Sequence, residues 1–257
     1  MSRALAYAAA MVLWGVAAAG FTIADPLASG TVFLSDNLKA QQADEAVNPG
    51  MLWVTEGAAL WKQADGVVNK SCASCHGAAE RSMQGVAARY PSVDVGTGQL
   101  LNLEGRINRC RKTNQQAEPY AYESDALLAL TAFVARQSLG MPRAVKVDGA
   151  AAPYYGAGKA LYHRRQGQLN LSCAQCHIDK VGRRLRGDTI SNGLGNGYPV
   201  YRLEWQSAGS LHRRFRSCLF GVRARQFDYG SPEFLQLELY IAKRAEGVAI
   251  ETPAIRK

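Results

Sequence analysis

Apolar residues recur at helical spacing in two well-separated stretches of the chain. The first stretch contains Leu127, Leu128, Leu130, Phe133 and Val134, and the second contains Phe234, Leu235, Leu237, Tyr240 and Ile241. Each run is followed by a glycine, Gly140 or Gly247, and glycine suits the end of a helix. The spacing therefore predicts two equivalent helices, each of which closes a unit of the chain.

A second repeat lies earlier in each unit. Nine residues recur at an offset of 101 positions: Gly57, Leu60, Gly66, Asn69, Ser71, Cys72, Ala73, Cys75 and His76 become Gly158, Leu161, Gly167, Asn170, Ser172, Cys173, Ala174, Cys176 and His177. Each set begins in a predicted helix, over Met51 to Gln63 and over Gly158 to Arg165. Self-similarity on this scale indicates a duplicated domain.

The repeat contains the chemistry of the chain. Cys72 to His76 and Cys173 to His177 both have the pattern CxxCH, by which c-type haem is attached covalently. Two thiols three residues apart share one face of a helical turn, and the following histidine can reach the iron. Paired cysteines could instead bind zinc, but zinc motifs usually lie about 15 to 20 residues apart. Here 98 residues separate the two motifs, which argues against zinc.

These features predict a mainly α fold of two tandem cytochrome c-like domains. The expected plan is a signal peptide over 1–24, an N-terminal extension over 25–50, a first domain over 51–140, a linker over 141–155 and a second, catalytic domain over 156–257. The apolar run from Ala4 to Ala24 after Arg3 is typical of a secretory signal, which would place the protein in the periplasm. A retained membrane anchor is the alternative, because the run is long enough to span a bilayer.

The second axial ligand of each iron is less obvious. His76 and His177 supply the first, but no methionine follows His177, so the second haem lacks the usual partner in its own domain. Cys110 and Cys218 lie at nearly equivalent places, and thiolate is a competent haem ligand. We therefore expect histidine and cysteine ligation at both irons.

Two alternatives to this ligation stay open. A disulfide between Cys110 and Cys218 would suit an oxidising compartment, although duplication should turn each cysteine toward its own haem. His212 could also serve as the second haem's ligand.

Charge narrows the choice of partners. The formal net charge is +9, and it falls to +8 if Arg3 leaves with the signal peptide. A basic surface attracts nucleic acid, anionic membranes, acidic proteins or small anions. Export argues against nucleic acid, which leaves small anions and acidic redox partners.

The sequence resembles the SoxA family of sulfur-oxidation cytochromes in its dihaem form. The resemblance extends from the first CASCH through the segment Arg106 to Cys110, the second CAQCH and the segment Arg214 to Cys218, into the closing helix. It implies an L-cysteine S-thiosulfotransferase that acts with a SoxX-like monohaem cytochrome, a SoxYZ-like sulfur carrier, thiosulfate and cytochrome c as electron acceptor. It also implies that Cys218 is the catalytic cysteine, which can carry an extra sulfur as a persulfide.

The residues around Cys218 agree with this chemistry. Arginine favours thiolate over thiol and presents a planar fork to oxyanions. We expect Arg214, four residues before Cys218, and Arg244, which aligns with Gln137 of the first half, to act in catalysis. For Arg213, Arg216 and Arg223 a solvated basic face is the simpler interpretation.

The predicted reaction is the oxidative conjugation of thiosulfate to a carrier cysteine. Cys218 would accept the sulfane sulfur, and a carrier thiolate would then attack that sulfur. A thiosulfate dehydrogenase that forms tetrathionate and a non-catalytic dihaem electron-transfer cytochrome are the alternatives. The nature of the acceptor would distinguish among the three.

Overall fold

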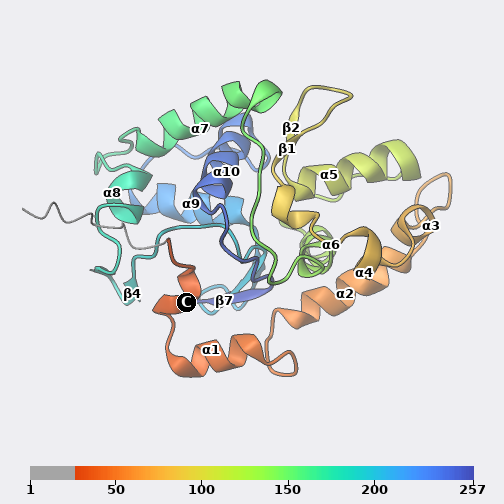
Figure 1. The fold of residues 1–257 in the computed structure, drawn as a ribbon, viewed down its shortest axis with the longest axis horizontal. Helices are drawn as coiled ribbons and strands as arrows, with labels where there is room; N and C mark the ends of the chain where they lie inside the picture. The colour runs from red at the N-terminus through yellow and green to blue at the C-terminus, as the bar shows by residue number, and fades with distance from the viewer. Residues whose placement is uncertain (1–26) are drawn as a thin grey trace, which may run out of the picture.

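The computed structural model describes residues 27–257. The predicted signal peptide lies outside these residues. Among residues 27–257, no helix combines the length and the apolar character needed to cross a membrane. Two groups of helices dominate the molecule, one coloured orange to green and the other teal to blue in Figure 1.

The first group follows the order that the repeat predicts. Its helices are α2 (Met51–Lys62), α3 (Cys72–His76), α4 (Ala79–Ser82), α5 (Leu103–Cys110) and α6 (Asp125–Arg136). The short strands β1 (Ser92–Val93) and β2 (Leu100–Leu101) form an antiparallel hairpin, and the short helices η2 (Ala87–Arg89) and η3 (Arg111–Gln115) complete the unit.

The second group repeats this order with additions. The helices are α7 (Ala152–His163), α8 (Cys173–His177), α9 (Leu211–Gly221) and α10 (Pro232–Arg244). The strands are β3 (Arg184–Leu185), β4 (Asp188–Thr189), β5 (Val200–Arg202), β6 (Ser207–Gly209) and β7 (Ala254–Arg256). β5 lies in the middle of a three-stranded sheet, antiparallel to β6 and parallel to β7.

Equivalent glycines allow the first and last helices of each group to cross in contact. A Cβ at Gly57 of α2 would lie 2.1 Å from the carbonyl oxygen of Ala129 in α6. A Cβ at Gly158 of α7 would lie 2.0 Å from that of Gln236 in α10. Both separations are too short for any side chain, so each crossing requires glycine. The sequence repeat is therefore also a repeat of helix packing.

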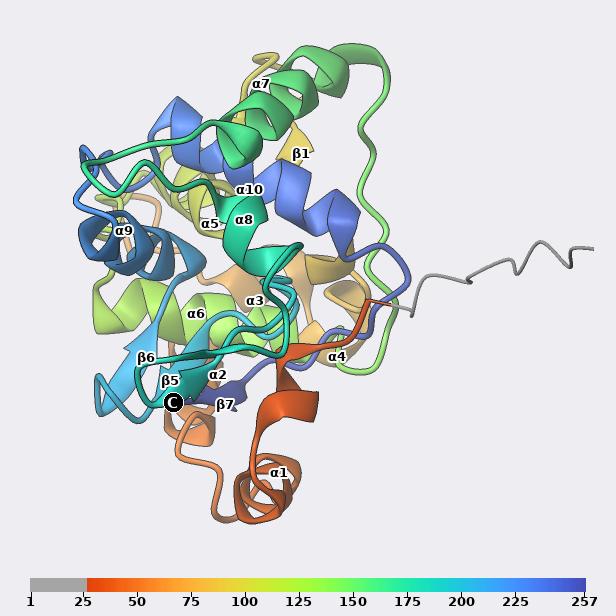
Figure 2. The ribbon, with the colours of Figure 1, turned by 90° about the vertical axis from the view of Figure 1, so that its left-hand side faces the viewer.

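The two CxxCH helices lie at opposite ends of the molecule. In Figure 1, α3 is at the right-hand end and α8 at the left-hand end, with α6 and α10 between them. Figure 2 looks onto the end that contains α7, α8 and α9. Each predicted haem therefore belongs to its own unit.

Aromatic stacking joins the two units. The ring of Tyr122 stacks on that of Tyr229, its equivalent in the repeat, with centroids 5.5 Å apart and an interplanar angle of 8°. Tyr122 also stacks on the buried His212, with centroids 5.2 Å apart and an interplanar angle of 4°. Buried polar groups surround the stack: Asn102 donates to the Tyr122 hydroxyl (2.6 Å) and to Glu238 (3.1 Å). The contact between units is thus tightly packed and hydrogen-bonded.

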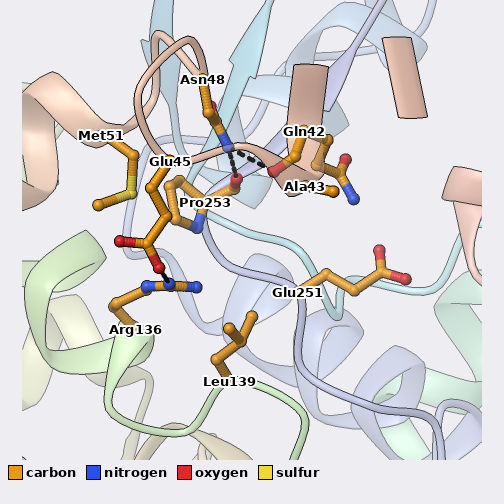
Figure 3. A pocket seen from close by; sticks show the side chains of 9 residues that line it. All are labelled: Gln42, Ala43, Glu45, Asn48, Met51, Arg136, Leu139, Glu251 and Pro253. Carbon is orange, nitrogen blue, oxygen red and sulfur yellow. Dashed lines mark hydrogen bonds and ion pairs between the residues drawn. The ribbon is translucent and has the colours of Figure 1, made fainter. Parts of the chain in front are cut away.

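The N-terminal extension packs against the C-terminal tail. It comprises the short helices η1 (Gly30–Phe33) and α1 (Asp36–Ala43). Figure 3 shows the amide of Asn48 donating to the carbonyl oxygens of Gln42 and Pro253, beside an ion pair between Glu45 and Arg136. These side chains line a cavity of about 220 Å³. The extension therefore connects the α6 end of the first unit to the tail of the second.

Some elements differ from the sequence expectation. Helix α7 begins at Ala152, six residues before the predicted start at Gly158, because Pro153 is favourable in a first helical turn. Helices α5 and α9 and the three-stranded sheet were not predicted. Polar residues dominate α5 and α9, and strands of two or three residues are too short to show an alternating pattern.

Candidate functional site

The second CxxCH motif forms the one-turn helix α8. Ser172 begins the helix with a capping box: its hydroxyl accepts from the Gln175 backbone N–H (3.2 Å), and its own N–H donates to the Gln175 side chain (2.9 Å). This cap stabilises a helix too short to be stable alone. Cys173, Cys176 and His177 therefore share the face expected for haem attachment.

The His177 ring is fixed by the segment that follows it. Its Nδ1 donates to the carbonyl oxygen of Ser191 at 2.8 Å, which leaves Nε2 as the nitrogen that can face a metal or Cys218. Gly193 approaches the ring so closely that a Cβ there would lie 2.7 Å from Cγ of His177. The imidazole is thus oriented with the correct nitrogen available to a metal.

Cys218 faces His177 from helix α9. The helix begins at the cap Ser210, whose hydroxyl accepts from the Arg213 backbone N–H at 3.1 Å. Burial raises the pKa of Cys218, but the Arg214 guanidinium, the His177 imidazole and Arg202 outweigh it, and the pKa falls to about 7. The thiolate is therefore accessible near neutral pH.

The remaining two thiols of this motif lie beside Cys218. Burial, with the nearby Cys218 adding to it, raises the pKa of Cys173 to about 12. The pKa of Cys176 is raised by the same two causes. Two thiols, an imidazole and a cysteine that faces it are the donor set that a c-type haem with histidine and cysteine ligands requires. The residues fit the predicted cofactor.

Arg214 is half-buried next to Cys218. The Cys218 thiolate raises the pKa of Arg214 and burial opposes this, with smaller contributions from Tyr198, Glu204 and Asp188. Within residues 27–257 its guanidinium makes no ion pair or hydrogen bond. All five of its N–H groups remain available to an anion.

Arg244, at the end of α10, has several partners. Its guanidinium donates to the Tyr162 hydroxyl, to the carbonyl oxygen of Asn192 (3.1 Å) and to that of His177 (3.4 Å). It also lies 4.8 Å from the centroid of the Tyr162 ring. Arg244 is therefore near the site, but its contacts are with the Tyr162 side chain and with the backbone of His177 and Asn192.

The first CxxCH motif has the same local helix structure as the second, but the residues around it differ. Ser71 caps α3 through a capping box with Ser74. Burial raises the pKa of Cys72, and Cys110 contributes to it, which places Cys110 on the same side as the CxxCH thiols. Arg106, the counterpart of Arg214, bonds the carboxylate of Asp94 at 2.8 Å. The first site therefore brings Cys110 close to a CxxCH thiol, but its arginine is already paired.

Comparison with known proteins agrees with this geometry. A model of the SoxA/TsdA cytochrome c domain matches residues 56–143 and 157–250. The L-cysteine S-thiosulfotransferase subunit SoxA of Pseudaminobacter salicylatoxidans is 41% identical over 230 residues, which cover 89% of this chain and 80% of that protein. This chain belongs to the SoxA/TsdA cytochrome c family.

Further relatives support the same family. SoxA of Paracoccus pantotrophus is 40% identical over 232 residues, which cover 90% of this chain and 80% of that protein. A chain in the crystal structure of SoxXA from P. pantotrophus superposes with a TM-score of 0.87 at 39% identity, covering 90% of this chain and 87% of that one. The predicted resemblance and the predicted fold of two tandem cytochrome c domains are confirmed, and c-type haem is the prosthetic group of such domains.

The structure does not support the two alternative roles for the late cysteines and His212. All six cysteines are free, so Cys110 and Cys218 are not joined. His212 is buried between the two family domains, where its Nδ1 accepts from the Gly230 N–H (3.1 Å) and its Nε2 lies 3.0 Å from Glu238. The two ring nitrogens of His212 therefore face Gly230 and Glu238 and not the predicted haem site.

Sequence reasoning missed three contributors to the second site. Ser191 and Gly193 orient His177, and Arg202, on strand β5, lowers the pKa of Cys218. The glycine-rich run around Gly193 was a usable signal, since close backbone approach requires glycine. No sequence signal pointed to Arg202, because the pairing of β5 with β6 and β7 is what brings it to the site.

Proposed function

We propose that this chain is the catalytic haem-bearing subunit of an L-cysteine S-thiosulfotransferase. The reaction conjugates thiosulfate oxidatively to a cysteine of a sulfur-carrier protein. The observation that carries the proposal is the pairing of a Cys218 thiol of lowered pKa with an adjacent, unpaired Arg214. The SoxA relatives, which bear the name of this activity, agree with it.

Cys218 is the proposed sulfur acceptor. Its thiolate and the sulfane sulfur of thiosulfate form a disulfide-type bond, with loss of two electrons. The carrier thiolate then attacks the sulfane sulfur, the bond to Cys218 breaks and Cys218 leaves as a thiolate. The carrier retains the thiosulfonate group, and Cys218 is restored. A persulfide on Cys218 would serve the same exchange with one additional sulfur.

Arg214 is proposed to bind the sulfonate. Its planar, permanently charged fork matches the geometry of an oxyanion, and its position one turn before Cys218 places it beside the sulfur that reacts. Arg202 adds a second positive charge near the thiolate. Together they stabilise both the thiolate and the incoming anion.

Arg244 remains a predicted participant with a modified role. Because its N–H groups contact the carbonyl oxygens of His177 and Asn192, we propose that it positions the segment around His177. Direct contact with substrate stays an untested prediction.

The proposed cofactors are two covalent haem c groups. Cys72 and Cys75 would attach the first, with His76 and Cys110 as iron ligands; Cys173 and Cys176 would attach the second, between His177 and Cys218. When bound, the second haem supplies one-electron redox chemistry and so removes the two electrons of the reaction. The first would be an auxiliary relay or a relic, since Arg106 is already paired with Asp94.

The proposed partners follow from the reaction and the family. A SoxX-like monohaem cytochrome would form the heterodimer, a SoxYZ-like protein would be the sulfur carrier, and cytochrome c would accept electrons. The two CxxCH motifs and the predicted N-terminal signal support export to the periplasm.

One assay tests the function. Purified holoprotein with its cytochrome subunit is mixed with thiosulfate and oxidised cytochrome c, with and without a carrier that has a free cysteine. Cytochrome reduction that requires the carrier, together with a thiosulfonate adduct on the carrier by mass spectrometry, is expected. Equal reduction without carrier, accompanied by tetrathionate, would establish the dehydrogenase instead, and no thiosulfate-dependent reduction would leave an electron-transfer cytochrome.

A further inference from the structure

A short hairpin follows directly after the second CxxCH helix. We call residues 180–190 the basic hairpin. Strands β3 and β4 pair antiparallel within it, with Leu185 opposite Asp188. Hydrogen bonds from Gly182 N–H to Ile190 (2.8 Å) and from Ile190 N–H to Arg183 (2.9 Å) close its base. It is therefore a built element with its own backbone pairing.

The basic hairpin is strongly positive and exposed. Its four cations, all exposed, are Lys180, Arg183, Arg184 and Arg186. Within residues 27–257 none of them forms an ion pair. Leu185 at the turn is 59% exposed, which adds one apolar contact point. Asp188 is the one acidic residue of the hairpin, so its net charge is +3, and the four cations repel each other.

The first domain has no counterpart to this charge. The interval from haem histidine to late cysteine is 41 residues in the second half and 34 in the first. In the first half, residues 77–101 contain two basic and two acidic residues and include helix α4 where the hairpin would be. The basic hairpin is therefore specific to the domain that contains Cys218.

The basic hairpin is continuous with the proposed active site. Directly after it, the carbonyl oxygen of Ser191 accepts from His177, and that of Asn192 accepts from Arg244. Asp188, on β4, lies close enough to Arg214 to contribute to the raised pKa of that arginine. In Figure 1, β4 lies at the left-hand edge of the molecule below α8. The hairpin thus flanks the proposed active site.

We propose that the basic hairpin is the docking surface for an acidic face of the sulfur-carrier protein, which it steers toward Cys218. This inference rests on the proposed function, because it requires a protein acceptor. Unpaired surface charge raises the rate of association with an oppositely charged partner more than it raises the affinity. The centre of a permanent interface is depleted in charge, so this surface suits a carrier that binds and leaves at each turnover.

The test uses the holoprotein complex and a charge-reversal pair, Arg183→Glu with Arg184→Glu. We expect kcat/KM for the carrier to fall roughly tenfold or more at low ionic strength, with kcat at saturating carrier unchanged. Arg183→Gln with Arg184→Gln should fall between wild type and the reversal. The control is Lys62→Glu with Lys112→Glu, which reverses two exposed charges of the first domain and should behave as wild type.

Two further measurements, activity with a small acceptor and gel filtration of the complex, distinguish a wrong docking surface from a wrong proposed function. With 2-mercaptoethanol as a small uncharged acceptor, all variants should match wild type. If wild type transfers sulfur to neither acceptor, the proposed function fails and the docking surface with it. If wild type works and the reversal variant is unchanged with the carrier, the docking surface alone is wrong. Loss of the cytochrome subunit on gel filtration of the reversal variant would instead make the hairpin the heterodimer interface, and overturn the proposal.

Discussion

Arg106 and Arg214 occupy equivalent positions, four residues before Cys110 and Cys218, yet their surroundings are opposite. Arg106 bonds Asp94 at 2.8 Å, and Arg109 bonds the same carboxylate at 3.3 Å. Arg214 makes no ion pair within the described chain, and the strongest influence on its pKa is the Cys218 thiolate. A guanidinium already paired with a carboxylate is a poor receptor for a second anion, so we expect the second domain to bind thiosulfate better than the first.

The two late cysteines should respond differently to substitution. Cys218→Ala removes both the sulfur acceptor and the proposed iron ligand, and should abolish carrier-dependent thiosulfate oxidation. Cys110→Ala should alter only the low-spin electron paramagnetic resonance signal of the first haem and leave most of the activity. Both proteins must be folded and fully loaded with haem. Equal loss of activity would refute the assignment of the active site to the second domain.

Arg214→Ala should weaken catalysis without loss of haem. A hydrogen bond to a charged group is worth about 1.5 to 3 kcal/mol, which corresponds to roughly tenfold to a hundredfold in rate if it acts in the transition state. Arg214→Lys keeps the charge but not the fork, and should recover part of the loss. Steady-state kcat/KM for thiosulfate measures both. Arg106→Ala is the matched control, and an equal effect there would contradict a specific role for Arg214.

Gly193→Ala should disturb the second haem through His177. A Cβ at this position would lie 2.7 Å from the ring, so the imidazole must move or rotate. We expect a changed resonance spectrum and reduction potential for the second haem only. Gly182→Ala is a matched control: its φ is also positive, at 79°, but nothing lies within 4 Å of the new Cβ. The control should lose stability without any spectral change, and identical spectra for both variants would count against the contact.

The buried carboxyl of Glu104 should make stability depend on pH. Burial, with Glu238 adding to it, raises the pKa of Glu104 to about 8 in the folded chain. The unfolded chain releases this proton near pH 4.3, so its stabilising contribution is complete below that pH and is lost as pH rises toward 8. The Gln side chain in Glu104→Gln stays neutral at every pH. The free energy of unfolding of this variant should therefore rise relative to wild type between about pH 4.3 and pH 8, and the difference should then stay constant.

Urea denaturation followed by circular dichroism from pH 4 to pH 9 measures this dependence. Glu118→Gln changes an exposed carboxyl and should show a constant difference from wild type. A constant difference for Glu104→Gln as well would mean that the carboxyl is ionised in the folded protein.

The sequence was most informative where the chemistry demands fixed spacing. The duplication, both CxxCH motifs and the closing helices could all be predicted, because covalent attachment and helix periodicity leave direct patterns. Arg244 shows the limit: alignment placed it in the second domain, but its contacts with the His177 and Asn192 carbonyls depend on how α10 crosses the loop. Arg202 and Ser191 act through strand pairing and backbone groups, which no side-chain pattern reports.

The stack of Tyr122 on Tyr229 has a consequence for how the halves are related. Contact between two equivalent residues is the arrangement found at the two-fold axis of an isologous interface in a symmetric dimer. In a dimer such a contact weakens on dilution, whereas here the covalent connection makes it independent of concentration. The joined halves are also free to diverge around the axis: His212 occupies the place of Glu104, and Glu238 that of Thr131. One chain thus contains a dimer whose two subunits no longer need to be identical, so that one can carry out chemistry while the other stays a cytochrome.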